Sequence, residues 1–259
     1  MHFRALLTAS CALLVTHALP FSAFAQNLAA TKPTSIVIVE LFTSEGCSSC
    51  PPADALLRQI NLKQTDAGQL IVGISEHVTY WNNLGWRDPY SLPVFTERQS
   101  IYASRLSAEG SYTPQMVLNG RDQFVGSNGG ALQHALLDDS RRSHLDLSIL
   151  SSNRTPSGVD VTFSLKQPVA KPLEIIAVLA DDADRSNVLR GENGGRLLQH
   201  VSVARSLTRV ATVKDDSEQS VHFPLPDRLQ ADSNSGHHLI LLAQEPNQGA
   251  ILGAATVPF

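Results

Sequence analysis

Two cysteines, Cys47 and Cys50, stand between a strand pattern and a helix pattern, and this junction constrains the fold more than any other feature. The preceding residues, Ser35–Phe42, form a β-branched apolar run of strand length without the 3.6-residue spacing of a surface helix. Pro51 and Pro52 follow, and proline fits a first helical turn because the N–H groups there have no intrahelical partner. The sequence therefore predicts a buried strand, a turn carrying the CxxC motif, and a helix beginning just after it.

The N-terminal residues have the pattern of a secretory signal peptide. Arg4 precedes the apolar stretch Ala5–Leu19, and Ala23-Phe24-Ala25 supplies a small-residue cleavage motif. We therefore expect residues 1–25 to be removed near Ala25, leaving residues 26–34 as a short N-terminal segment of a periplasmic or secreted protein. The apolar stretch is short for a bilayer span, and no later segment reaches about 18 uninterrupted apolar residues, so no membrane span is expected.

Composition excludes several classes of protein. Of the 259 residues, 42% are hydrophobic and 17% are charged, which excludes a disordered chain, a collagen-like repeat and a coiled coil. The net charge of -4 argues against a broad basic surface, so we expect no nucleic-acid partner.

The cysteine count points to chemistry at the CxxC motif. Signal cleavage would remove Cys11, leaving Cys47 and Cys50 as the only cysteines of the mature chain. A disulfide that closes so small a loop removes little entropy from the unfolded state, so it would stabilise a chain of this length only slightly. Redox or metal chemistry is therefore the preferred interpretation.

The pattern of elements changes along the chain. Up to residue 142 it predicts the order βαβαββα, with a second strand at Gln69–Ser75, a polar and aromatic insertion at residues 76–93, and a helix at Val94–Ser107. From residue 143 to 259, about seven short alternating segments separated by Gly, Pro, Asn and Asp clusters predict a β-sandwich.

Four runs of sequence, ELFTSEGCSSCPPAD, HVTYWNNLGWRDPYS, YTPQMVLNG and RGENGGRLLQHVSVARSL, resemble the secreted thioredoxin-like family catalogued as domain of unknown function 1223. The resemblance extends from about Ser35 to the C-terminus. It implies a fold class of an α/β thioredoxin-like domain, residues 35–142, followed by an all-β, sandwich-like C-terminal domain, residues 143–259. It supplies no substrate, because the activity of the family is largely uncharacterised.

The resemblance assigns roles around the CxxC motif. Cys47 would be the exposed nucleophile and Cys50 the resolving thiol, with the helix N-terminus stabilising the Cys47 thiolate. Pro114 resembles the cis-proline that packs beside the CxxC motif of thioredoxin-like proteins, and the backbone at Thr113 would hold an extended substrate. Glu40 would be a buried acid that exchanges a proton with Cys50, unless its carboxylate points outward at the strand end.

Candidate substrate-binding residues lie in the insertion. His77 follows the end of a strand, where ligands gather in open α/β folds, and Trp81 and Trp86 are the only tryptophans of the chain. These side chains could wall a substrate groove above Cys47, or form a small satellite core instead.

Three functions agree with these residues. The first is an exported thiol-disulfide oxidoreductase that acts on protein disulfides or dithiols, needs no cofactor besides its own redox-active disulfide, and exchanges electrons with an unidentified redox partner. The second is a copper-binding or metallochaperone protein in which Cys47, Cys50 and His77 hold the metal. The third, a non-catalytic interaction module, leaves the thiol pair unexplained.

Overall fold

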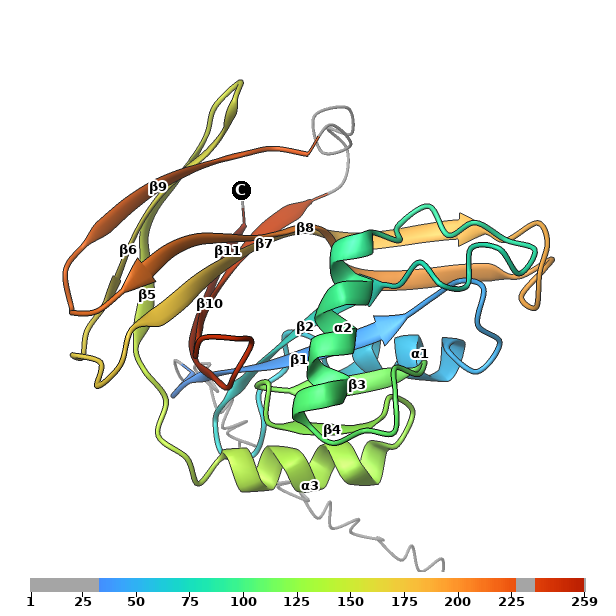
Figure 1. Ribbon diagram of the computed structural model, residues 1–259, viewed down its shortest axis with the longest axis horizontal. Helices are drawn as coiled ribbons and strands as arrows, with labels where there is room; N and C mark the ends of the chain where they lie inside the picture. The colour runs from blue at the N-terminus through green and yellow to red at the C-terminus, as the bar shows by residue number, and fades with distance from the viewer. Residues whose placement is uncertain (1–32, 227–235, 259) are drawn as a thin grey trace, which may run out of the picture. The chain divides into compact units, whose positions relative to one another are not determined.

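The computed structural model describes residues 33–226 and 236–258 (Figure 1). The predicted signal peptide, with Cys11, and residues 26–32 of the N-terminal segment lie outside the described residues. Within the described part, no helix is long and apolar enough to cross a membrane.

The described residues contain three helices and eleven strands. The helices are α1 (Pro51–Ile60), α2 (Pro93–Arg105) and α3 (Gly129–Asp139). The strands are β1 (Ile36–Thr43), β2 (Leu70–His77), β3 (Gln115–Leu118), β4 (Asp122–Val125), β5 (Leu147–Arg154), β6 (Gly158–Leu165), β7 (Leu173–Asn187), β8 (Leu197–Val213), β9 (Gln219–Pro224), β10 (His237–Gln244) and β11 (Ile251–Pro258).

Eight of these strands form one mixed sheet in the order β11-β10-β7-β8-β2-β1-β3-β4, and β5-β6-β9 form a second, three-stranded sheet. The predicted fold class, a thioredoxin-like α/β domain followed by a separate all-β domain, is therefore wrong. The two segments share a sheet because β8 pairs with β2 at Val203 and Ser75, so β2 is an internal strand between β8 and β1. The protein is mostly β.

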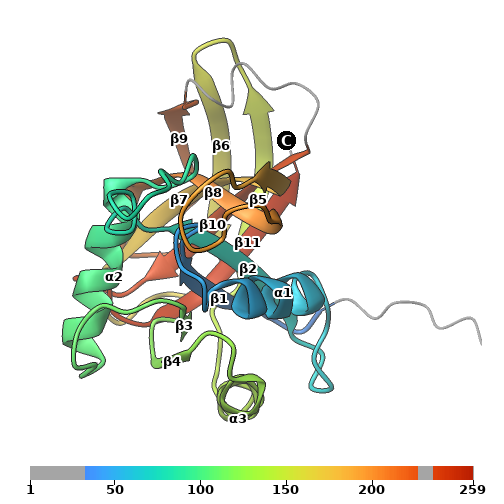
Figure 2. The same cartoon turned by 90° about the vertical axis from the view of Figure 1, so that its right-hand side faces the viewer.

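Helices cover both faces of the large sheet around β1 (Figure 2). Alternate β1 side chains, such as Val39 and Leu41, pack against α1 and α3, whereas Ile38 and Phe42 pack on the opposite face with residues of α2. Because successive side chains of a strand point to opposite faces, the continuous apolar run in β1 is what a strand covered on both sides requires.

The three-stranded sheet packs on the C-terminal strands of the large sheet. The buried residues of this core include Val161 and Phe163 of β6, Ile175 and Leu179 of β7, and residues of β10. The β-sandwich expected from residues 143–259 is thus replaced by a second layer on the same large sheet. The end of β1, where the cysteines follow, lies at the other end of this sheet (Figure 1).

Candidate functional site

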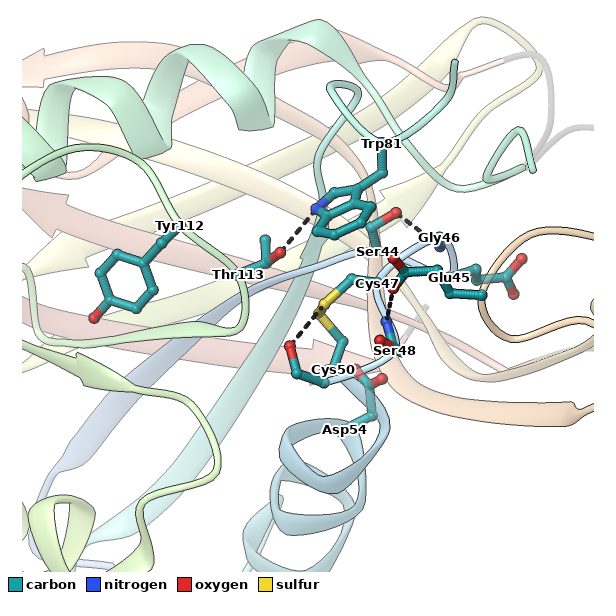
Figure 3. Close-up of a disulfide and its surroundings, with 12 residues drawn as sticks. Ser44, Glu45, Gly46, Cys47, Ser48, Cys50, Asp54, Trp81, Tyr112 and Thr113 are labelled. Atoms are coloured by element: carbon teal, nitrogen blue, oxygen red, sulfur yellow. Dashed lines mark hydrogen bonds between the residues drawn. A yellow bond between two sulfur atoms is a disulfide. The ribbon is translucent and has the colours of Figure 1, made fainter. Parts of the chain in front are cut away.

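Cys47 and Cys50 form a disulfide in the turn between β1 and α1 (Figure 3). Both cysteines are fully buried, whereas Ser48 and Ser49 between them are exposed. The expectation that Cys47 is exposed is therefore wrong for the oxidised protein. The cause is the covering of the turn by two loops from distant parts of the chain, described below.

The first turn of α1 offers the sulfur atoms few backbone donors. Pro51 and Pro52 have no N–H group, and the N–H of Ala53 donates to the Cys50 carbonyl oxygen at 2.8 Å. The Ser49 hydroxyl lies 3.3 Å from the sulfur of Cys47 and must be the donor, because a disulfide sulfur carries no proton. Stabilisation of a Cys47 thiolate therefore depends on Ser49 and on the helix dipole more than on free N–H groups.

Trp81 links the CxxC turn to the segment before β3. Its indole N–H donates to the Thr113 hydroxyl oxygen at 2.8 Å, and a Cβ placed on Gly46 would lie 3.0 Å from the Trp81 Cβ (Figure 3). The Thr113-Pro114 peptide bond is cis, as the resemblance of Pro114 to a cis-proline predicts. The CxxC turn, the insertion and the segment before β3 therefore meet at this end of the sheet.

Trp86 also contacts the CxxC turn. Its indole N–H donates to a carboxylate oxygen of Glu45 at 2.7 Å. Glu45 is fully buried, and it also accepts a hydrogen bond from the Ser186 hydroxyl. The two tryptophans are half-buried and pack on the CxxC turn.

His77 lies behind this turn. Its Nδ1 is 2.7 Å from Asp88, which also accepts the backbone N–H of Glu45. Burial opposes the charge of Asp88, but His77 and the backbone donors hold the pKa of its carboxyl below the usual value. His77 is fully buried, so it does not line an open substrate groove. Through Asp88 it stabilises the CxxC turn instead.

The metal alternative requires His77 to join the two cysteines. Within residues 33–226 and 236–258, no group of three or more His, Cys, Asp or Glu side chains is arranged to hold a metal ion. Both sulfur atoms are engaged in the disulfide, and the Nδ1 of His77 is engaged by Asp88.

The loop between β7 and β8, residues 188–196, covers the CxxC turn and was not identified as part of the site from the sequence. The side-chain amide of the buried Asn193 donates to the carbonyl oxygens of both Glu45 and Cys47, each at 2.9 Å. Glu192 accepts the backbone N–H of Ser48 at 2.9 Å. This covering loop therefore binds the backbone of the turn at Glu45, Cys47 and Ser48.

The covering loop also touches the insertion. Gly85 has a φ of 105°, and a Cβ placed on it would lie 3.2 Å from the Cα of Gly191. Glycine is favoured here because φ is positive and a side chain would crowd the backbone of Gly191. The insertion and the covering loop therefore form one continuous cover over the disulfide.

Asn193→Ala should open this cover. Loss of two buried hydrogen bonds, at about 1 kcal/mol each, should raise the population of the opened loop by up to about 30-fold. We expect reduction of the disulfide by a small dithiol to accelerate to a similar extent, measured as the rate of thiol release. Asn153→Ala, at an exposed position of β5, is the control. An unchanged rate in Asn193→Ala would show that the loop does not limit access.

A second missed residue, His200 of β8, lies beneath the CxxC turn. Its Nε2 is 3.4 Å from Glu45, and its Nδ1 is 3.7 Å from Asp54 of α1. Burial opposes a charged imidazole, but these two carboxylates outweigh it and raise the pKa of His200 to about 10. The ring is therefore a buried cation at neutral pH. The only signal in the sequence was its place in the run RGENGGRLLQHVSVARSL.

Glu40 does not face the cysteines. Its carboxylate accepts hydrogen bonds from Arg98 of α2 at 2.5 Å and from the Tyr102 hydroxyl at 2.8 Å. The expected proton exchange with Cys50 is therefore not supported, because Glu40 alternates with Leu41 and points to the α2 face, whereas Leu41 packs on the α1 face. Glu76 lies nearby, and burial together with the charge of Glu40 raises the pKa of its carboxyl well above the usual value.

The described residues define a mostly β protein whose CxxC disulfide is buried under two loops. The chain belongs to the family described as protein of unknown function (DUF1223), whose model matches residues 38–244. No curated protein matches the chain.

Two solved structures give different degrees of similarity. A crystal structure of a protein from Agrobacterium tumefaciens is 27% identical, with a TM-score of 0.65, and the match covers 86% of this chain and 94% of that chain. A β-glucosidase from Kluyveromyces marxianus in complex with glucose is 10% identical, with a TM-score of 0.28, over 77% of this chain and 18% of that chain. The second similarity is too low to carry an argument.

Proposed function

We propose that the protein is an exported thiol-disulfide oxidoreductase that uses Cys47 and Cys50 on the disulfides or dithiols of other exported proteins. The observation that carries the proposal is the charged network directly beneath the CxxC turn, in which Glu45, His200 and Asp54 are all buried. Burying three ionisable groups is costly, and a disulfide that merely cross-links the chain does not need them.

The positions of the two cysteines also support this function. Cys50 is the N-cap of α1, and Cys47 lies one turn before it beside the Ser49 hydroxyl, so Cys47 has both the helix dipole and a hydroxyl donor to favour its thiolate. An attacking Cys47 thiolate would form a mixed disulfide with the substrate, and Cys50 would then displace the substrate sulfur.

The test is disulfide exchange with a reduced, unfolded protein that contains several cysteines. The oxidised chain should transfer its disulfide to this substrate, measured as the loss of substrate thiols and the gain of two thiols per chain. A chain with both Cys47→Ser and Cys50→Ser should show only the background rate. Equal rates for the two chains would refute the proposed function.

Trp81 should favour polypeptide substrates over small disulfides. The half-buried ring lies beside both the CxxC turn and Thr113, so it offers apolar surface where a peptide would reach the disulfide. Trp81→Ala should lower the rate of reaction with a protein disulfide by about tenfold, which is equivalent to about 1.4 kcal/mol of lost contact energy. The rate with oxidised glutathione should change much less.

The control for this prediction is Trp81→Phe, which keeps an aromatic ring but loses the hydrogen bond to Thr113. It should retain most of the activity on the protein disulfide. If Trp81→Ala lowers both rates equally and lowers the melting temperature, the ring belongs to a satellite core rather than to a substrate surface.

A further inference from the structure

Asp54 has a buried acceptor that lacks a donor in the oxidised protein. Its side chain is 5% exposed, and among the described residues its Oδ1 has no hydrogen-bond partner. Asp54 follows Cys50 by four residues at the start of α1, and residues so spaced lie on the same face of a helix. Figure 3 shows Asp54 at the start of α1, next to Cys50 and the CxxC turn.

Reduction of the disulfide would supply that donor. A disulfide sulfur has no proton, but the thiol of reduced Cys50 has one and would face the Asp54 carboxylate. An unpaired buried acceptor costs about 1–3 kcal/mol, so the contact should favour the protonated form of Cys50.

His200 links Asp54 to solvent. Its Nδ1 is the Asp54 neighbour at 3.7 Å, and this atom also has no hydrogen-bond partner among the described residues. The ring lines a pocket of about 370 Å³ together with Arg58, Asp184 and Gln199. A proton could therefore pass between this pocket and Asp54 without opening the loops over the cysteines.

We propose that Asp54 and His200 are positioning residues that set the protonation of Cys50, with Asp54 facing its thiol and His200 balancing the carboxylate charge and exchanging the proton with solvent. This proposal rests on the proposed function, because it concerns the thiol that leaves when the disulfide is opened.

The reaction with a substrate dithiol balances as follows. A substrate thiolate attacks the sulfur of Cys47, the Cys47–Cys50 bond breaks, and its electron pair goes to Cys50. The Cys50 thiolate takes a proton from His200 through Asp54, and His200 recovers one from solvent. The second substrate thiol, having lost its proton to solvent, then displaces Cys47. Cys47 leaves as a thiolate and takes a proton from solvent. The substrate is thereby oxidised to a disulfide, and the CxxC pair is reduced to two thiols.

Several charged and titratable groups face His200. Glu45 comes from the CxxC turn, Asp54 from α1, His77 from β2, Tyr90 from the insertion and Asp184 from β7. Burial first, and then Asp181, raise the pKa of Asp184 to about 6, although Arg205 and His200 oppose this. At neutral pH the protonated His200 therefore balances part of the negative charge of the carboxylates around it.

The experiment measures the pKa of Cys50 in reduced protein carrying Cys11→Ser and Cys47→Ala, from the ultraviolet absorbance of the thiolate. Asp54→Asn removes a negative charge and should lower this pKa by about 1 unit, a tenfold change in the thiolate ratio. His200→Asn removes the balancing cation and should raise it by a similar amount. A purely structural role would not produce shifts of opposite sign.

The control is His134→Asn, which removes an exposed histidine paired with Asp138 on α3 and should leave the pKa of Cys50 unchanged. If His200→Asn does not fold, Glu45→Gln replaces it and should lower the pKa of Cys50, as Asp54→Asn does. Shifts of the same sign for Asp54→Asn and His200→Asn, or no shift in any folded variant, would overturn the proposal. The titration uses no substrate, so an enzymatically inactive chain could still show the shifts.

Discussion

Cys50→Ala should accumulate a covalent complex with a substrate polypeptide, whereas Cys47→Ala should accumulate at least about tenfold less. In Cys50→Ala the remaining Cys47 thiol can attack a substrate disulfide, but no second thiol is present to resolve the product. Cys47 is favoured as the attacking thiol because Ser49 lies 3.3 Å from its sulfur, whereas Cys50 leads directly into α1 beside the Asp54 carboxylate. Non-reducing electrophoresis after mixing with an oxidised protein would measure the complex.

The two variants are matched controls for each other. Both lose the same disulfide, whose four-residue loop contributes about 2 kcal/mol through loop closure, so both should be destabilised by the same mechanism. Each also retains one thiol in the CxxC motif. A larger amount of covalent complex in Cys47→Ala than in Cys50→Ala would reverse the assigned roles. Equal amounts would contradict the prediction, because neither thiol would then be the preferred nucleophile.

Local structure around the cysteines could be predicted because each element has a strong signal of its own. The run Ser35–Phe42 is observed as β1, and the prolines after Cys50 begin α1 as expected. The two adjacent strands in the predicted order βαβαββα are β3 and β4, and Asn119 and Gly120 both have positive φ at the turn between them, which is typical of an Asn-Gly hairpin turn. These features depend on a few neighbouring residues.

The sheet could not be predicted in the same way, because hydrophobic alternation shows which face of a strand is buried but not which strand lies beside it. The pattern from residue 143 onward predicted only short strands, but Leu173–Asn187 forms the 15-residue β7, paired with β8 almost throughout its length. Its polar second half, Asp181–Asn187, contains no apolar run. That half nevertheless carries the covering loop to the CxxC turn.

The charges beneath the disulfide were missed for a related reason. Glu45 is only two residues from Cys47, but its burial depends on Trp86 and on Ser186, which is 141 residues away in the sequence. His200 stands in a strand pattern that gives no sign of its two carboxylate neighbours. A buried ionic network is a property of the tertiary fold, and the sequence could show only that residues of the right types were present.

Because His200 is held as a buried cation, the protein should lose stability as the pH rises from about 6.5 to about 10. The ordinary pKa of histidine, about 6.5, applies to the unfolded chain, and the folded value is about 10. The folded state therefore binds one proton more than the unfolded state between these limits, and the free energy of unfolding should fall by up to about 1.4 kcal/mol per pH unit. Below pH 6.5 this contribution is fully present.

Urea unfolding at a series of pH values would measure this slope, and His200→Asn should flatten it while lowering stability most at pH 6 to 7. The pKa of His144 is raised mainly by its hydrogen bond to Asp139, so His144 also contributes to the slope. That contribution is the same in both proteins and cancels when their profiles are subtracted. His222→Asn, which removes a half-exposed histidine paired with Asp160 on the three-stranded sheet, is the matched control. Parallel pH profiles for His200→Asn and the wild type would mean that His200 is neutral in the folded protein, and the network beneath the disulfide would then lack its cation.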